Sequence, residues 1–223
     1  MIIARTHITA HCKALSTLTA VALTGLIALP IAMPITGCSS TSKRTTSDKM
    51  MDEINPAIAY AQRQKAEAIE HYNIASELHA EGKNIEAIAE YRKSLELNQK
   101  FYPSWNNMGQ LLMSEGNFND AVSAFRIASG LELEDPRPEY NIGLVYQKLG
   151  WEEDAFEHFQ TALEREPHFI PALRGIIKSA NALGLGNEQI MEYIRTAQLH
   201  DSDDAWRDYF RKQHYRVQAL MDN

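Results

Sequence analysis

Residues 102–135 read YPSWNNMGQLLMSEGNFNDAVSAFRIASGLELED, and this stretch decides the fold because its key positions recur along the chain. Gly116 in its middle has counterparts at Gly82, Gly150 and Gly184, each 34 residues from the next. A fixed period of this length is typical of solenoid proteins, in which one structural unit stacks on the next. The pattern therefore predicts a repeat protein.

Small residues and aromatics keep the same offset of 34 residues on both sides of these glycines. The small residues are Ala75, Gly109 and Gly143 before the glycine and Ala87, Ala121 and Ala155 after it, and the aromatics are Tyr91, Phe125, Phe159 and Tyr193. Glycine accepts the left-handed backbone that ends a helix, and small residues let two antiparallel helices approach closely. We expect the aromatic to fill the space against the following unit.

This grid resembles the tetratricopeptide repeat family, whose pattern has a small residue at position 8, glycine near 15, alanine at 20 and an aromatic at 24. The resemblance implies an all-α fold, an α-solenoid with the right-handed superhelix of that family. Its helix pairs are expected at 68–101, 102–135, 136–169 and 170–203. The fourth repeat departs from the pattern, because Ile177 stands at position 8 and Gln189 at position 20. We expect these bulkier side chains to separate its two helices slightly.

Further helices are predicted at both ends of the repeats. Asn55 and Pro56 indicate a helix start, so residues 55–67 are expected to form a helical extension. Whether this extension runs straight into the first repeat helix or forms a second helix stays open. Residues 204–223 mix apolar and charged side chains, which predicts a capping helix. Within it, Trp206 is expected to be packed core, with a ligand contact as the alternative.

The first 37 residues have the layout of a secretory signal. Arg5 and Lys13 precede a stretch that is uncharged as far as Gly37, and no Asp or Glu occurs before Asp48. A positively charged start followed by an apolar segment is typical of export signals. Residues 1–37 are therefore predicted to be a signal peptide.

The signal ends in ITGC, residues 35–38, which resembles the lipobox of bacterial lipoproteins. The resemblance implies that Cys38 carries acyl chains and becomes the mature N-terminus. An uncleaved signal anchor is the alternative, because about 20 apolar residues can span a bilayer. Pro30 and Pro34 argue against that alternative, since proline interrupts a helix.

The lipobox implies an envelope protein held to a membrane by lipid. In lipoproteins of enteric bacteria an Asp after the cysteine favours the inner membrane, so Ser39 in that position favours the outer membrane, with the protein facing the periplasm and the inner membrane as the alternative. Residues 38–54 begin with a run of small polar and charged side chains and are predicted to be a flexible tether. Without residues 1–37 the chain keeps 20 Lys and Arg against 29 Asp and Glu, a formal charge of −9. Such an acidic chain is a poor binder of nucleic acid.

The resemblance also predicts a binding groove, because the first helix of each tetratricopeptide pair lines a concave face. Position 6, one of the groove positions, is asparagine in three successive repeats, Asn73, Asn107 and Asn141. An amide both donates and accepts hydrogen bonds, so this row can hold an extended peptide backbone of any sequence. The alternative is that these amides are solvated or form hydrogen bonds between helices.

Other groove positions carry aromatic and basic side chains. Position 5 holds Tyr72, Asn106, Tyr140 and Arg174, and Lys148 and Lys178 add positive charge towards the C-terminal end. Tyrosine offers apolar area with a polar tip, which suits binding surfaces. The cations predict a preference for a carboxylate or another anionic group, with a solvated charge cluster as the alternative.

Signs of chemistry are missing from the sequence. It contains no phosphate loop, zinc-protease motif or CxxC pair, and its histidines lack the spacing of metal ligands. After the signal, tether, repeats and cap, no stretch is left for a catalytic domain. The sequence therefore predicts a binding protein that is no enzyme and needs no cofactor or small-molecule substrate.

The leading hypothesis is a membrane-anchored scaffold that binds an extended segment of another envelope protein and assists assembly or stability of a complex. The combination of lipobox and repeats is similar in layout to the outer-membrane lipoproteins of type IV pilus biogenesis. Two alternatives stay open. One is a structural lipoprotein that self-associates through exposed end or convex surfaces. The other is an accessory subunit that docks a cell-wall enzyme.

Overall fold

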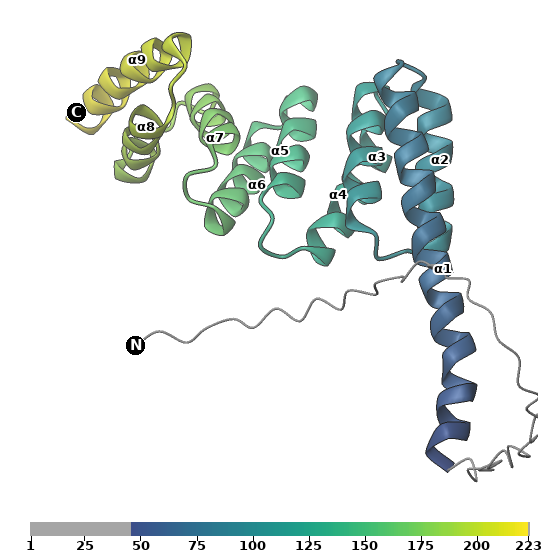
Figure 1. Cartoon of the computed structure of the whole chain (residues 1–223). Coiled ribbons are helices and arrows are strands. Elements are labelled where there is room, and N and C mark those ends of the chain that lie inside the picture. The colour runs from purple at the N-terminus through teal and green to yellow at the C-terminus, as the bar shows by residue number, and fades with distance from the viewer. Residues whose placement is uncertain (1–45, 223) are drawn as a thin grey trace, which may run out of the picture. The chain divides into compact units, whose positions relative to one another are not determined.

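The computed structural model describes residues 46–222, and every regular element in that range is a helix. The helices are α1 (Thr46–Ala80), α2 (Asn84–Leu97), α3 (Tyr102–Ser114), α4 (Phe118–Leu131), α5 (Arg137–Leu149), α6 (Glu152–Arg165), α7 (Ile170–Ala182), α8 (Glu188–His200) and α9 (Asp204–Met221). Successive helices form antiparallel pairs that stack side by side, with α9 after the fourth pair (Figure 1). The predicted all-α solenoid is confirmed.

The four equally spaced glycines close the turn inside each pair. Gly82, Gly116, Gly150 and Gly184 all have a positive φ, between 70° and 80°. In each case the N–H of the next residue bonds to a carbonyl five residues earlier, as from Lys83 to Leu78 at 2.9 Å. This is the Schellman ending of a helix, which satisfies carbonyls that the helix leaves unpaired. The recurring glycine thus sets where each first helix stops.

Aromatic side chains fill the core between helices whose glycines make room for them. Tyr91, Phe125 and Phe159 are fully buried. A Cβ atom on Gly109 would lie 2.7 Å from the Phe125 ring, and one on Gly143 would lie 2.6 Å from the Phe159 ring. Such distances are too short for real side chains, so only glycine allows this packing. The small residue at position 8 therefore admits the aromatic at position 24.

The fourth repeat keeps the pattern with a shift of one residue. The buried face of α8 includes Ile190, Ile194 and Ala197, which follow Ala155, Phe159 and Ala162 by 35 residues rather than 34. The side chain of Asn187 caps this helix by accepting the N–H of Ile190 at 3.0 Å. Gln189 is exposed, so its side chain does not separate the two helices, whereas Ile177, the other bulky residue, is fully buried. The longer linker before α8 moves the register instead.

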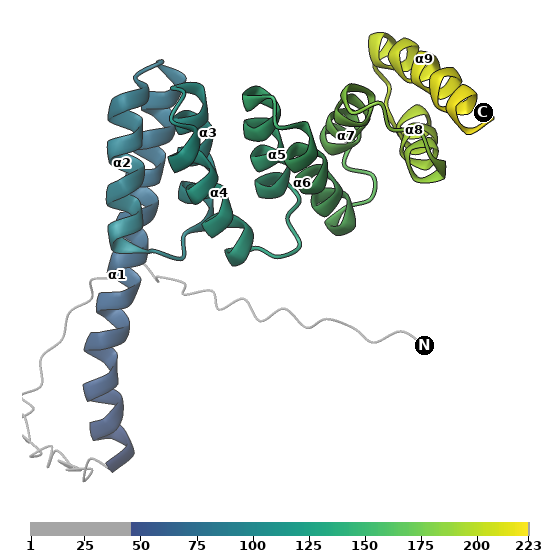
Figure 2. The ribbon, with the colours of Figure 1, turned by 180° about the vertical axis from the view of Figure 1, so that it is seen from behind.

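Helix α1 is one continuous helix, and it begins earlier than the sequence suggested. It starts at Thr46 and contains Pro56 in its interior, so residues 46–54, placed in the tether, belong to the helix. Only the C-terminal part of α1 packs against α2, as both views show (Figures 1 and 2). The signal peptide, Cys38 and the first part of the tether lie outside the described residues.

Helix α9 contacts α8 and α7 and buries Phe210 and Val217 completely. Asp203 caps its start by accepting the N–H groups of Ala205 and Trp206 at 3.0 and 3.3 Å. At its other end Leu220 packs against Gly186, in the linker before α8. Within residues 46–222, none of the helices combines the length and the apolar character that a bilayer crossing requires.

Candidate peptide-binding site

The first helices of the pairs lie next to one another and form one continuous face. Helix α3 contacts α5, α5 contacts α7, and α7 contacts α9. A hydrogen bond from Asn107 to Tyr72 links α3 to α1 in the same way. We call this surface the first-helix face, made by the C-terminal half of α1 together with α3, α5 and α7. All nine predicted groove residues are on these helices.

Four of the predicted residues form a chain of hydrogen bonds across three repeats. Asn141 donates to Asn106 at 3.2 Å, Asn106 donates to Asn107 at 3.3 Å, and Asn107 donates to the hydroxyl of Tyr72 at 3.2 Å. The amides therefore alternate between positions 5 and 6 instead of following position 6 alone. This chain joins α5 to α3 and α3 to α1, so the amides help to fix the repeats relative to one another.

The position-6 asparagines differ in how accessible they are. Asn141 is 5% exposed, Asn107 is half-buried, and Asn73 is exposed. A primary amide carries two N–H donors and an acceptor oxygen. The hydrogen bonds to Tyr72 and from Asn106 use one donor of Asn107 and one lone pair of its oxygen. Asn107 therefore keeps capacity for a ligand, and Asn73 can meet one in solvent. Asn141 acts mainly between helices, which is the alternative that the sequence left open.

A cavity of about 240 Å³ lies at the C-terminal end of the first-helix face. Its lining comes from α5, α7 and α9 and consists of Tyr140, Leu144, Gln147, Pro171, Arg174, Gly175, Lys178 and Trp206. The Tyr140 ring is fixed by Phe169, which meets it edge-on with 5.6 Å between ring centroids. We call this the α5/α7/α9 cavity. It brings together three predicted residues, Tyr140, Arg174 and Lys178.

The two cationic side chains of the cavity differ in their ion pairing. Arg174 forms a bidentate pair with the buried Asp201, at 2.7 and 2.8 Å, and lies 3.6 Å from Asp203. Among the described residues no carboxylate lies at ion-pair distance from Lys178, and its Nζ lies 5.4 Å from the centre of the Trp206 ring. Lys178 can therefore offer its charge to a ligand, whereas Arg174 is already neutralised. Lys148 is exposed and does not line the cavity.

The ion pair shifts the pKa of both partners. The hydrogen bond from Arg174 lowers the pKa of Asp201 more than burial raises it, and Asp201 in turn raises the pKa of Arg174. Burial raises the pKa of Tyr140, and the charge of Arg174 partly opposes this rise. At neutral pH Tyr140 is therefore a neutral phenol, and Arg174 and Asp201 form a closed ion pair.

The sequence predicted Trp206 to be packed core, with a ligand contact as the alternative. The structure shows it half-buried, packed against the core and lining the α5/α7/α9 cavity. The guanidinium of Arg174 lies 4.7 Å from the centre of its ring, so the indole is held by a cation–π contact as well as by packing. A smaller hollow of about 200 Å³ continues from it along Lys178, Ala205 and Tyr209. The signal for this role was weak, because Trp206 lies beyond the repeat pattern.

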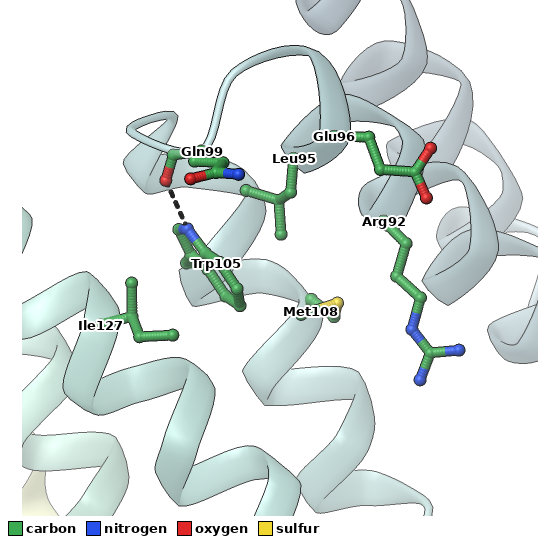
Figure 3. A pocket seen from close by; sticks show the side chains of 7 residues that line it. All are labelled: Arg92, Leu95, Glu96, Gln99, Trp105, Met108 and Ile127. Atoms are coloured by element: carbon green, nitrogen blue, oxygen red, sulfur yellow. Dashed lines mark hydrogen bonds between the residues drawn. The ribbon is translucent and has the colours of Figure 1, made fainter.

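A second and larger hollow, of about 610 Å³, lies between α2, α3 and α4. Leu95, Trp105, Met108 and Ile127 form its apolar part, and Arg92 and Glu96 extend from α2 at its rim (Figure 3). Trp105 donates its indole N–H to the carbonyl of Gln99 at 2.8 Å, which fixes the ring. No predicted groove residue lines this hollow.

The corresponding positions one repeat later carry a network of charged side chains. Glu139 follows Trp105 by 34 residues and is buried, and it accepts hydrogen bonds from Ser129 of α4 and from Arg165 of α6. His158 Nδ1 lies 2.8 Å from its other oxygen. Burial raises the pKa of Glu139, but hydrogen bonds from His158 and Ser129, together with the charge of Arg165, outweigh this effect and leave the pKa below its usual value. This network joins the second repeat to the third.

Among the described residues, no group of three or more His, Cys, Asp or Glu side chains is arranged to hold a metal ion.

Comparison with known proteins agrees with this architecture. Residues 71–101, 102–133 and 140–169 match the tetratricopeptide repeat family. Human Superkiller complex protein 3 is 25% identical over 95 residues, and human protein O-mannosyl-transferase TMTC3 is 30% identical over 81 residues. These matches cover 43% and 36% of the chain but only 6% and 9% of the two human proteins.

Solved structures show the same fold. YrrB, described as a tetratricopeptide repeat protein with an unusual peptide-binding site, is 18% identical with a TM-score of 0.57, covering 81% of this chain and 86% of its own. MamA is 20% identical with a TM-score of 0.56, covering 72% and 97%. The first such domain of Spaghetti (RPAP3), bound to an HSP90 peptide, is 22% identical with a TM-score of 0.51, covering 53% and 94%. The described part of the chain is thus a helical solenoid in which three segments match the tetratricopeptide repeat family.

Proposed function

We propose that this protein is a lipid-anchored scaffold that binds an extended peptide segment along its first-helix face. The observation that carries the proposal is the placement of the half-buried Asn107 amide and the α5/α7/α9 cavity on successive first helices. An extended peptide needs polar groups for its backbone and a pocket for at least one side chain or terminus. This face offers both kinds of group in one line along the stack.

The cavity favours a ligand group that is partly apolar and anionic. Tyr140 and Trp206 provide aromatic walls, and Lys178 provides a positive charge that no carboxylate of the described residues engages. A carboxylate at the end of an apolar side chain, or at a chain terminus, can contact the walls and the ammonium group together. Peptide binding by related folds supports this reading, because the RPAP3 domain is bound to a peptide.

The anchor and the envelope setting rest on the sequence. The signal layout and Cys38 suggest a lipoprotein, and Ser39 favours the outer membrane with the repeats in the periplasm. The partner is then an extended segment of another envelope protein, and the scaffold assists the assembly or stability of a complex. The layout of type IV pilus lipoproteins agrees with such a role. Binding of this kind requires no catalysis.

Panning a random-peptide display library against the full chain tests the binding site. Selected peptides are expected to lose affinity about tenfold with Lys178→Ala, because one charge-assisted contact is removed. Lys148→Ala is the matched control, since Lys148 is an exposed lysine of α5, the helix that carries Tyr140, but lies outside the cavity. Equal binding by both variants, or a library without enriched peptides, would contradict the proposal.

Cell fractionation tests the anchor separately. Cys38→Ser removes the acyl acceptor, so the variant is expected in the soluble fraction while the wild type stays with membranes after a carbonate wash. Retention of the variant in membranes would show that residues 14–37 act as a signal anchor instead.

A further inference from the structure

Helix α1 is much longer than the surface that α2 covers. Of its 35 residues, the C-terminal part packs on α2, with Ala75 in a common core with Ala87 and Tyr91. Residues 55–63, in contrast, are all exposed. Ile58 is 50% and Tyr60 64% exposed. Both views show this half of α1 extending past the end of α2 (Figures 1 and 2).

The face of α1 that α2 covers continues into the uncovered half. Ala61, Ala68 and Ala75 follow one another at steps of seven residues, and Ala68 and Ala75 are fully buried. Ile58 precedes Ala61 by three residues as Tyr72 precedes Ala75, so both pairs lie on the same side of the helix. The sequence repeats this spacing further back, with Met51 and Ile54. A seven-residue apolar repeat is the pattern by which one helix packs along another.

We call this seven-residue apolar repeat on α1 the stripe. The residues beside it allow two identical helices to meet. Ala57, Gln62 and Gln64 take the flanking positions, which are the ones that face each other across a helix pair, and none is charged. Two copies would therefore bring together apolar side chains without repulsion at their edges. Lys65 interrupts the stripe just before the part covered by α2. A pair of helices would separate at this point.

From this face we infer that the N-terminal half of α1 pairs with the same segment of a second copy, as a short parallel coiled coil. A self-complementary stripe on identical chains gives a symmetric dimer. The parallel direction rests on the proposed function, because two anchored chains enter α1 from one membrane. Anchoring also raises the effective concentration, which a stripe of about two heptads needs in order to associate. Dimerisation through α1 leaves the first-helix face open and provides two peptide sites on one particle.

Cysteine crosslinking in membranes of cells that express the full chain tests the pairing. Ala61→Cys lies in the stripe, and oxidation with copper phenanthroline is expected to give at least about tenfold more disulfide-linked dimer than Ala59→Cys. Ala59 is the matched control, since it is exposed on the same turn but points away from the stripe. Adding Ile58→Asp to Ala61→Cys is expected to abolish the dimer, whereas adding Lys178→Ala is expected to leave it unchanged.

Several results would overturn the inference. They are equal crosslinking from both positions, no crosslink from either, or a product whose mass shows another protein on the stripe. Failure of the peptide site can be distinguished from failure of the dimer. The effect of Lys178→Ala is measured as peptide affinity, and the effect of Ile58→Asp is measured as dimer yield. Failure of the anchor is distinguishable too, since fractionation of the Cys38→Ser variant measures it directly.

Discussion

The ring of Phe159 lies against the backbone of Gly175, where a Cβ atom would come within 2.7 Å of the ring carbons. Gly175 takes position 6 of the fourth repeat, the position of Asn73, Asn107 and Asn141 in the earlier repeats. Core packing between the third and fourth repeats thus removes the fourth amide. The row of asparagines ends where the α5/α7/α9 cavity begins.

Gly175→Ala is expected to destabilise the fold. The added methyl group overlaps a fully buried ring, and such overpacking costs about 1–3 kcal/mol in the free energy of unfolding. Gly130→Ala is the control, because a Cβ there meets nothing within 4 Å, and the change is expected to be neutral or stabilising by up to about 1 kcal/mol. Urea denaturation of both variants measures the difference. Equal urea midpoints for the two variants would contradict the packing of Phe159 against Gly175.

Gly150→Ala is expected to cost about 1–2 kcal/mol for a different reason. Its φ is 76° and no atom lies within 4 Å of a Cβ at this site, so only the backbone conformation opposes a side chain. Gly150→Asn should lose less, because asparagine tolerates the left-handed region better than alanine. Thermal unfolding of the two variants checks this order. A larger loss with asparagine would point to a steric cause.

Glu139 is expected to make the stability of the protein depend on pH. Its folded-state pKa lies below the ordinary 4.5, so the ionised carboxylate stabilises the fold above that value. This contribution is lost as the pH falls from the unfolded-state pKa through the lowered folded-state pKa. Glu139→Gln should therefore be less stable than wild type at neutral pH, by about 1–3 kcal/mol.

Denaturation from pH 7 down to about 3 measures this effect, and the gap between wild type and Glu139→Gln should shrink below about pH 4.5. Glu153→Gln serves as control, since Glu153 is an exposed residue in the first turn of α6 and its replacement should change stability little. A gap that stays constant at acidic pH would show that hydrogen bonding, and not charge, explains the loss.

Replacing Arg174 and replacing Lys178 are expected to have different effects on stability and on peptide binding. Arg174→Ala leaves the buried Asp201 without its partner, and it should lower the free energy of unfolding by about 1–3 kcal/mol. Lys178→Ala removes no ion pair and should leave stability nearly unchanged while weakening peptide binding. Differential scanning calorimetry together with peptide titration separates the two effects. Equal melting temperatures would contradict the structural role of Arg174.

The sequence by itself determined the repeat architecture. The 34-residue spacing of glycine, alanine and aromatic residues predicted the helix pairs, because each of these types meets a local demand: a left-handed turn, a close helix contact, or a filled core. The first-helix positions of the nine groove residues followed from the same grid. The N-terminal signal and Cys38 are likewise readable from sequence, and they stay predictions.

The tertiary structure decided what individual side chains do. Periodicity could not show that Asn141 donates to Asn106, that Asp201 neutralises Arg174, or that Trp206 lines the cavity, because these contacts join residues from different elements. The repeat pattern also did not predict the one-residue shift of α8 or the early start of α1. Spacing along a chain fixes which face of a helix a residue takes, whereas the partner on that face depends on how the helices pack.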